Sequence, residues 1–382
     1  MDVPSSADVV IVGGGIMGTS VAFHLAEAGV RVVLVERGEL GSGSTCKAAG
    51  GVRAQFSDAL NIQLGARSLA AYRRFGRTPG QDVDLRTTGY LFLLSRPGDV
   101  ASFEAGVALQ NELGVPSRMV DVTEARRLSP LIATDGLLAA AYSPEDGYCT
   151  PESAVLGYAV GARRHGATLL TGCEILGIDT RGGEIHAVRT SGGRIATSTV
   201  VCAAGAWSAA VGEMVGVRLP VTPYRRQLAF TEPVAPDVPA PMTLDFSSAF
   251  YFRREGQGLM FGMSDPHEQP GFRLNRTQRW LAELAGQMAV RVPAALEAGI
   301  TGGWAGLYEV TPDHNALIGE SPEVGRFLYT TGFSGHGFMQ APAAGEIMRD
   351  LVLEKKPFVD VGPLDARRFE GTAQLRTESN YV

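Results

Sequence analysis

Cysteine, long apolar runs and clustered basic charge are all scarce in this 382-residue sequence. The four cysteines (Cys46, Cys149, Cys173 and Cys202) stand far apart without a CxxC pair. This spacing argues against a metal centre and a disulfide framework, and it favours a reducing compartment. No apolar run approaches the ~20 residues of a membrane span. The first residues, MDVPSSAD, lack the basic and apolar regions of a secretory signal. We therefore expect a cytoplasmic protein without a membrane span.

Positive charge is not concentrated anywhere in the chain. The formal net charge is −6, and pairs of adjacent arginines are scattered at 73–74, 126–127, 163–164, 225–226, 253–254 and 367–368. Nucleic-acid binding needs clustered Lys and Arg, so we expect no nucleic-acid partner. We interpret the arginine pairs as solvated ends of helices and strands.

A glycine-rich turn stands near the start of the chain. The run Val9–Val12 is β-branched and apolar, which predicts a strand buried on both faces of a parallel sheet. Gly13, Gly15 and Gly18 follow at GxGxxG spacing. In this motif the first glycine allows a sharp turn, the second lets a pyrophosphate approach the backbone, and the third lets helix and strand pack closely.

The flanking segments complete a dinucleotide-binding unit. Residues 16–28 carry apolar residues at helical spacing, Gly29 ends that run, and residues 31–35 predict a second strand. Glu36 follows 21 residues after Gly15, where a carboxylate can accept hydrogen bonds from a ribose. Together these features favour a dinucleotide site over a purely structural βαβ unit. The motif alone leaves open whether the dinucleotide is FAD or NAD.

The rest of the chain alternates helical and β-like patterns. Residues 37–58, rich in Gly and Ser, predict a long loop that wraps a cofactor, with Lys47 and Arg53 available for anionic groups. We expect helices over 61–75, 99–113, 123–128 and 151–165, strands over 87–94, 167–170, 174–180 and 199–203, and a hairpin of 184–189 with 194–197. Residues 218–317 alternate short β-like runs with prolines around one helix at 276–290, which predicts an antiparallel sheet.

A second glycine turn, GFSGHGFM at 332–339, follows a strand and opens a helix. Backbone amides at such a helix N-terminus can face an anionic or electron-rich ring edge, which in a flavoenzyme is the flavin N1–C2 carbonyl region. The alternative interpretation is a packing turn.

Six segments, taken in order, resemble the D-amino-acid oxidase group of FAD-dependent oxidoreductases. They are DVVIVGGGIMGTSVAFHLAEAG, VVLVER, GSGSTCKAAGGVR, STVVCAAGAWS, GGWAGLYEVTPDHNALIG and YTTGFSGHGFMQAPAAGE. The first is common to Rossmann-like flavoproteins, and the last two are far more specific. Within the group, the sequence is most similar to the branch of sarcosine oxidase, glycine oxidase, dimethylglycine dehydrogenase and proline dehydrogenase subunits.

The resemblance implies a fold and a division of the chain. The fold is α/β, with a Rossmann-like FAD-binding domain (glutathione-reductase-like) and an α+β substrate domain built on an antiparallel sheet. We expect residues 1–86, 145–217 and 318–365 in the FAD-binding domain and residues 87–144 and 218–317 in the substrate-binding domain. Residues 366–382 form a C-terminal tail.

The resemblance also implies cofactor contacts from every part of the FAD-binding domain. Glu36 and Arg37 would hold the adenosine ribose, and the backbone of Ile175 would meet the adenine. Gly205 and Trp207 would close over the cofactor. The full expected set is Gly13, Gly15, Ile16, Met17, Gly18, Glu36, Arg37, Ser44, Lys47, Ala48, Ala49, Gly50, Ile175, Gly205, Trp207, Gly335, His336, Gly337, Phe338 and Met339.

By the same resemblance, Arg53 would bind a substrate carboxylate, with Asp58 and Met339 nearby. The alternative is a loop arginine satisfied by Asp58, although an arginine offers a planar fork that suits a carboxylate. Tyr251 and Tyr308 would frame the pocket, or they are ordinary half-buried aromatics. His336 is a candidate catalytic residue, and a structural contact with the flavin is the favoured interpretation of it.

Several positions depart from the family pattern. Gly306 and Lys47 stand where relatives link the flavin through cysteine or histidine, so we expect non-covalent FAD. Met339, Met260 and Ser264 stand where sarcosine oxidase has a carboxylate-binding lysine, an oxygen-activating lysine and a pocket histidine. These departures argue against sarcosine as substrate, and they leave the electron acceptor open.

The resemblance implies FAD-dependent oxidation of an amine or amino acid. A secondary or N-alkyl amino acid, glycine- or proline-like, would pass hydride from the carbon α to nitrogen to flavin N5 and become an imine. The acceptor is oxygen, or the chain is a dehydrogenase subunit that passes electrons to a partner protein or quinone. Homo- or hetero-oligomers are both compatible with the sequence. An NAD-dependent Rossmann enzyme and a non-catalytic flavin-binding protein are the alternatives of another class.

Overall fold

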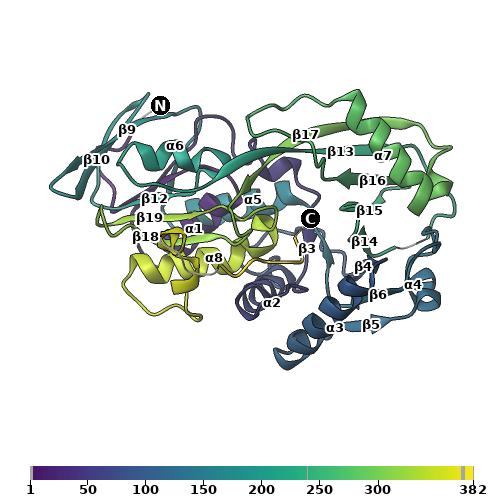
Figure 1. Cartoon of the computed structure of the whole chain (residues 1–382). Coiled ribbons are helices and arrows are strands. Elements are labelled where there is room, and N and C mark those ends of the chain that lie inside the picture. The colour runs from purple at the N-terminus through teal and green to yellow at the C-terminus, as the bar shows by residue number, and fades with distance from the viewer. Residues whose placement is uncertain (1–2, 239, 371–374, 382) are drawn as a thin grey trace.

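The computed structural model describes residues 3–238, 240–370 and 375–381. A six-stranded sheet, with strands from both ends of the chain, forms one half of the molecule. It is parallel except at its edge, where β18 runs antiparallel to β19. In sheet order its strands are β18 (Leu317–Glu320), β19 (Phe327–Thr331), β12 (Val200–Cys202), β1 (Val9–Val12), β2 (Val32–Val35) and β8 (Thr168–Leu170). Figure 1 shows these elements on the side of the molecule that holds the N-terminus.

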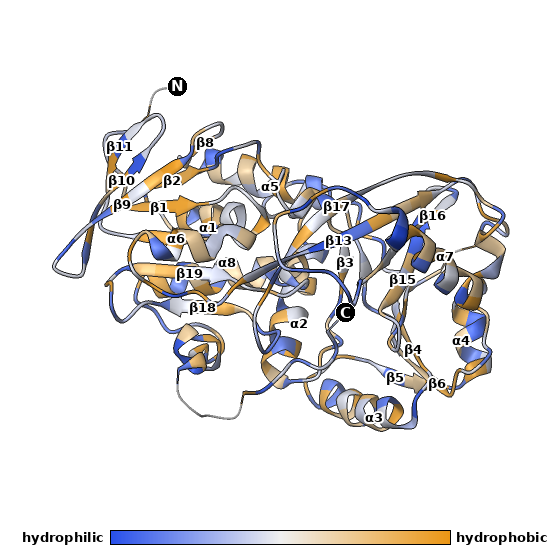
Figure 2. Cartoon of the chain, turned by 45° about the horizontal axis from the view of Figure 1, so that its top comes forward, coloured by the Kyte–Doolittle hydropathy of each residue, from blue (hydrophilic) through white to orange (hydrophobic). Residues whose placement is uncertain are grey.

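Both faces of this sheet are buried, as the apolar run Val9–Val12 predicts. Ile11 and Leu34 face one core and Val10 and Val33 face the other, because neighbouring side chains of a strand point to opposite faces. The first core is covered by helices α1 (Ile16–Glu27), α2 (Ala59–Arg73), α5 (Pro151–Arg164) and α8 (Gly337–Val352). The second is covered by α6 (Ser208–Glu213) and by a three-stranded sheet of β9 (Ile175–Arg181), β10 (Glu184–Thr190) and β11 (Gly193–Ala196). Figure 2 shows β1 and β2 as strongly apolar strands between these layers.

An eight-stranded sheet forms the second half. In order its strands are β17 (Ile300–Val310), β13 (Thr222–Thr231), β16 (Gly258–Met263), β15 (Phe250–Glu255), β14 (Met242–Asp245), β4 (Tyr90–Leu94), β6 (Ala139–Ser143) and β5 (Arg118–Val120). The predicted antiparallel sheet is present, with one correction: β14 and β4 pair in parallel. The long strands β13 and β17 extend back toward the first sheet (Figure 1).

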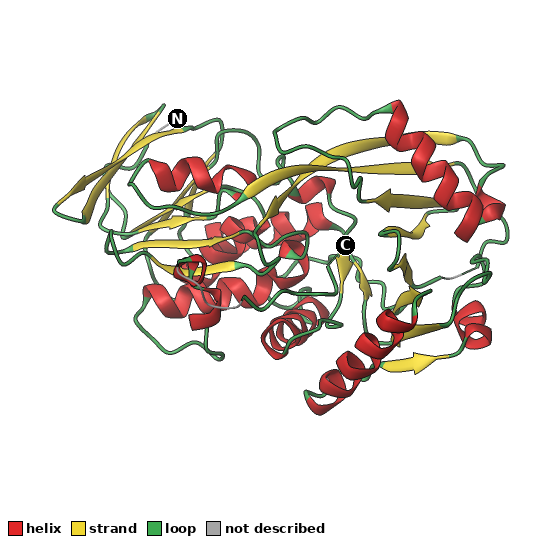
Figure 3. Ribbon diagram, viewed as in Figure 1, coloured by secondary structure: helices red, strands yellow, loops and turns green. Residues whose placement is uncertain are grey.

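The second sheet is apolar on both faces, and helices pack on each of them. Helix α7 (Gln278–Arg291) buries Trp280 and Leu284 against Phe252 of β15 and Phe261 of β16. Figure 3 shows this helix on the outer side of the second sheet. The opposite face carries Tyr90 and the side chains that line the site described below. Helices α3 (Pro97–Glu112) and α4 (Val122–Leu128) cover the far end, and a two-stranded ladder of β3 (Gly51–Val52) and β7 (Gly147–Tyr148) completes the fold.

The predicted helices and strands agree with the structure to within a few residues at their ends, where boundaries are least certain. The interpretation of the arginine pairs as solvated ends is wrong at three places. Arg225, Arg254 and Arg368 are buried or nearly so, and each donates to several protein acceptors. Among the described helices, none combines the length and the apolar character that crossing a membrane requires.

We expect Trp280→Ala to lower the free energy of unfolding by about 3–5 kcal/mol, because it leaves a cavity in the core under α7 and removes the bond from Nε1 to the Met263 carbonyl. Urea unfolding followed by circular dichroism measures the change. Val290→Ala on the same helix is the matched control, since Val290 is 50% exposed. Equal effects of the two substitutions would contradict the assigned packing of α7.

Candidate cofactor and substrate site

A cavity of about 490 Å³ lies where the parallel strands of the first sheet end. Its walls come from the turns that follow β1, β2, β12 and β19, from residues 41–53, and from the inner face of the second sheet. Crevices at the carboxyl ends of parallel strands are where open α/β sheets bind nucleotides. The long loop predicted to wrap a cofactor therefore lies against this crevice.

The first glycine turn has no room for side chains. Gly13 has φ +110°, and a Cβ there would lie 2.4 Å from the Ala203 carbonyl oxygen. A Cβ on Gly18 would lie 1.9 Å from the Gly13 oxygen, so Gly18 brings helix and strand together and does not line the cavity. These contacts fit the predicted packing role of Gly18, and its predicted contact with the cofactor stays a prediction. Gly15 lines the cavity as predicted.

The end of the cavity where the resemblance expects the adenosine gathers four of the expected residues. Glu36 accepts hydrogen bonds from the backbone N–H groups of Gly14 (2.7 Å) and Gly38 (2.8 Å), and each of its oxygens retains a lone pair for a ribose hydroxyl. The Arg37 guanidinium lies 4.1 Å from the centroid of the Trp207 ring. Ile175, the first residue of β9, lines the same end.

The remaining expected cofactor residues also line the cavity: Ile16, Met17, Ser44, Lys47, Ala48, Ala49, Gly50, Gly205, Gly337, Phe338 and Met339. Lys47 Nζ donates to the carbonyls of Ser42 (2.6 Å) and Gly43 (3.1 Å). A Cβ at Gly306 would lie 2.9 Å from the Lys47 Cβ. The two positions where relatives link their flavin are therefore neighbours here, and neither carries a cysteine or histidine.

The second glycine turn carries an imidazole without hydrogen bonds. Gly335 has φ +99°, and a Cβ there would lie 2.3 Å from the Tyr308 ring. His336 lines the cavity, and neither of its ring nitrogens has a partner among the described residues. Burial, followed by the charge of Arg53, lowers the pKa of His336 well below its usual 6.5. A neutral ring with a free donor and a free acceptor fits a polar cofactor edge better than it fits a base.

Arg53 is 4% exposed and lines the cavity. Its guanidinium stacks on the Phe56 ring at 4.2 Å and donates to the Gln55 carbonyl and, at 2.8 Å, to the Asn380 carbonyl. The alternative of an arginine satisfied by Asp58 is wrong. Asp58 caps α2 by accepting from Asn61 N, and it does not line the cavity.

The two predicted tyrosines both line the cavity. Burial raises the pKa of Tyr308 to about 12 and that of Tyr251 well above its usual 10, so both phenols are protonated at neutral pH. Of the positions where this sequence departs from the family pattern, Met339 lines the cavity, whereas Met260 and Ser264 do not. Met260 belongs to an apolar cluster behind the wall.

Several polar residues that line the site were not predicted, among them Tyr90, Arg226 and Glu309. A signal existed for Arg226, since it shares a strand face with Leu228, which also lines the cavity. Glu309 accepts from the Thr331 hydroxyl (3.1 Å) and the Phe333 N–H (3.4 Å). Burial raises its pKa to about 7.

These residues fit FAD. Two glycine turns present helix N-termini to one cavity, a carboxylate is available for a ribose, and a neutral imidazole with unpartnered nitrogens stands at the opposite end. Backbone amides at helix N-termini suit both a pyrophosphate and an electron-rich ring edge.

We expect Gly335→Ala to reduce the flavin content of the purified protein several-fold, because the methyl group would displace the Tyr308 ring and strain a residue at φ +99°. The flavin-to-protein absorbance ratio measures this. Gly286→Ala on α7 is the control, since a Cβ there meets nothing within 4 Å. Full flavin content in Gly335→Ala would contradict the assigned cofactor turn.

Glu309 generates a prediction of pH dependence. Its pKa is raised from 4.5 to about 7 in the folded protein, so the folded state holds a proton that the unfolded state has lost between these values. The free energy of unfolding therefore falls as pH rises through this window. Asp146 and Glu378, also raised to about 7, add to the same slope.

We expect Glu309→Gln to make this fall shallower, so that the variant gains stability relative to the native chain between about pH 5 and about pH 8. Urea unfolding of the flavin-free protein across this range measures the difference. A difference that does not change with pH would contradict the assigned ionisation of Glu309.

Comparisons with known proteins agree with the site. A family model described as "FAD dependent oxidoreductase" (DAO) matches residues 8–351. Mouse (Mus musculus) mitochondrial dimethylglycine dehydrogenase is 30% identical over 95% of this chain, and the chain spans only 44% of that protein's length. Bovine (Bos taurus) FAD-dependent oxidoreductase domain-containing protein 1 is 32% identical over 92% of this chain and 82% of its own.

Solved structures show the same fold across almost the whole chain. The L-proline dehydrogenase from P. horikoshii superposes with a TM-score of 0.92 at 34% identity, covering 96% of this chain and 99% of its own. The glycine oxidase from Geobacillus kaustophilus superposes with a TM-score of 0.86 at 26% identity, covering 96% and 100%. The resemblance and the fold class inferred from the sequence are thereby confirmed. This chain belongs to the DAO family of FAD-dependent oxidoreductases.

Proposed function

We propose that this chain oxidises an α-amino or N-alkyl amino acid at the carbon next to nitrogen and so forms an imine. The observation that carries the proposal is Arg53, a buried guanidinium that lines the cavity together with a neutral imidazole and two half-buried tyrosines. A buried cation of this kind suits a carboxylate, which pairs with the arginine fork through charge-assisted hydrogen bonds. FAD, when bound, supplies the two-electron acceptor.

The charge of Arg53 also acts on the substrate nitrogen. The same field that disfavours protonation of His336 disfavours an ammonium group bound nearby. The amine must be neutral for the reaction, because only a free lone pair stabilises the positive charge that develops on the adjacent carbon. The site thus promotes loss of the substrate proton without a residue acting as general base. The tyrosine walls exclude water and orient the substrate.

The identity of the electron acceptor gives a second candidate. Electron transfer to a protein partner or quinone, rather than to oxygen, is favoured by the similarity to the L-proline dehydrogenase and the dimethylglycine dehydrogenase. Met260 supports this candidate, because it offers no positive charge where the resemblance expects an oxygen-activating lysine. Peroxide formed by the reduced protein in air separates the two candidates.

The flavin linkage and the domain boundaries that the sequence predicts also belong to this proposal. We propose non-covalent FAD, which the side chains at positions 47 and 306 support, and the two-domain division with its predicted boundaries. The four free thiols favour a reducing compartment such as the cytoplasm. Homo- and hetero-oligomers both remain compatible with the chain.

The test is a screen of amino acids, N-methyl amino acids and cyclic imino acids for anaerobic bleaching of the flavin. We expect Arg53→Lys to raise KM for the active amino acid by about 10- to 100-fold with a smaller change in kcat, because the bidentate contact is lost. Arg218→Lys is the control, since Arg218 is exposed and away from the cavity. If no amine bleaches the flavin, or if Arg53→Lys leaves KM unchanged, the proposal is wrong.

A further inference from the structure

Arg226 is a cavity-lining guanidinium whose hydrogen bonding is incomplete. It lies on β13, with its guanidinium carbon 4.9 Å from the centroid of the Tyr308 ring. Nη1 donates to the Arg225 carbonyl and Nη2 to the Tyr381 hydroxyl, both at 3.0 Å. The buried Nε has no partner among the described residues. A buried donor without an acceptor is costly, and it is expected where a ligand supplies the acceptor.

Arg53 and Arg226 both donate hydrogen bonds to the same short segment, residues 380–381. Asn380 accepts from Arg53 through its backbone carbonyl, and Tyr381 accepts from Arg226 through its hydroxyl. Both acceptors are uncharged. A carboxylate forms shorter and stronger hydrogen bonds with a guanidinium than a neutral oxygen does. An anionic ligand in the cavity therefore competes favourably for these donors.

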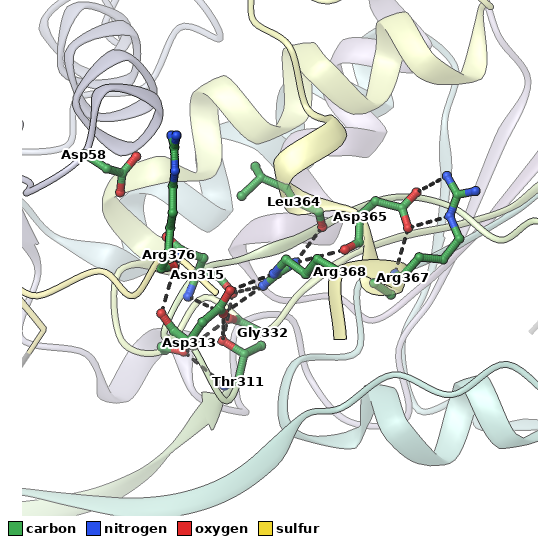
Figure 4. Close-up of polar contacts among 12 residues, drawn as sticks. Asp58, Thr311, Asp313, Asn315, Gly332, Leu364, Asp365, Arg367, Arg368 and Arg376 are labelled. Carbon is green, nitrogen blue, oxygen red and sulfur yellow. Dashed lines mark hydrogen bonds and ion pairs between the residues drawn. The ribbon is translucent and has the colours of Figure 1, made fainter. Parts of the chain in front are cut away.

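The segment is anchored independently of the two arginines. Glu378 accepts from the Ser57 N–H (3.1 Å) and from the N–H of Asn380 (2.8 Å), and the Tyr381 ring stacks on His314 with centroids 3.8 Å apart. Asn315 Nδ2 donates to the Arg376 carbonyl at 2.7 Å. Figure 4 shows Asn315 beside Asp313 and Arg368, a buried ion pair that fixes this turn. Tyr381 can thus leave Arg226 without the whole segment detaching.

We propose that Arg226 is a second carboxylate-binding residue of the substrate site, and that the Tyr381 hydroxyl holds it until the carboxylate takes its place. This inference rests on the proposed function, since it assumes an anionic substrate. It assigns to Arg226 the second cationic contact that Met339 cannot make. It also explains why Arg226 lines the cavity whereas Arg225, its neighbour in the chain, pairs with Glu268 on the other face of β13.

The experiment measures the binding of unreactive carboxylates to the flavin-loaded protein. Benzoate and pyrrole-2-carboxylate, and their uncharged amides, are titrated while the flavin absorbance is followed. We expect Arg226→Gln to weaken both carboxylates by about tenfold or more and the amides by less than about twofold, because only the charge-assisted bonds are lost. Arg218→Gln, at an exposed arginine, is the matched control and leaves both unchanged.

Tyr381→Phe gives a result of opposite sign. Removing the hydroxyl frees Nη2 of Arg226, so we expect the carboxylates to bind about two- to fivefold more tightly and the amides to bind as before. This variant loses one oxygen atom, and it keeps the test valid should Arg226→Gln fail to fold.

Each outcome bears on a named claim. Unchanged carboxylate affinity in Arg226→Gln, or equal losses for carboxylates and amides, overturns the assignment of Arg226. Unchanged or weaker carboxylate affinity in Tyr381→Phe overturns the displacement of Tyr381. If the native protein oxidises an amino acid, either of these two results overturns only the roles assigned to Arg226 and Tyr381. If the native protein binds no carboxylate and oxidises no amine, the proposed function fails with it.

Discussion

The rest of the structure depends on the close approach of backbone segments at the glycine turns. Gly13 packs against the Ala203 carbonyl, and Gly18 packs against Gly13 itself, at separations that no side chain permits. These contacts set β1 and α1 directly beside β12. Because the turns after β1 and β12 form part of the cavity wall, the spacing of these strands helps to decide how much room the cavity has for a cofactor. A larger residue at Gly13 or Gly18 would push these backbone segments apart and disturb the pairing of β1 with β12.

Buried ionisable groups are the second feature that shapes the site, and they are of two kinds, an acid and a pair of arginines. Glu309 stands between the turn at Gly332 and the turn at Gly205, where burial keeps it protonated to about neutral pH. The Arg53 and Arg226 guanidiniums line the cavity, and the oxygens that accept their hydrogen bonds are uncharged. Buried unpaired charges are costly for folding, so their retention in one cavity is a sign of ligand binding. Burial, followed by the charge of Arg53, lowers the pKa of His336 and keeps its ring neutral.

The two sheets contribute different chemical groups to the site. The turns at the ends of the first sheet present backbone amides and the Glu36 carboxylate, which suit a nucleotide. The second sheet presents an apolar face with a few polar groups, which suits a small substrate. Strands β13 and β17 carry Arg226 and Tyr308 from the second sheet to the cofactor turns. This arrangement brings side chains of the second sheet to the cavity beside the Gly335 turn.

The sequence by itself determined the parts of the site that lie close together along the chain. The glycine motif, the following helix and Glu36 belong to one βαβ unit, so their spacing specifies their geometry, and family motifs extended this to Arg53, Tyr308 and His336. Only the tertiary structure decided the contacts that join distant segments. Arg225 and Arg226 are neighbours with opposite environments, because the sheet order chooses which face of β13 meets the cavity. Asp58 lies close to Arg53 in the sequence, yet the capping of α2 holds it elsewhere. Asn380 and Tyr381 reach arginines 327 and 155 residues away, and no local pattern encodes such a contact, since it depends on the packing of the whole chain.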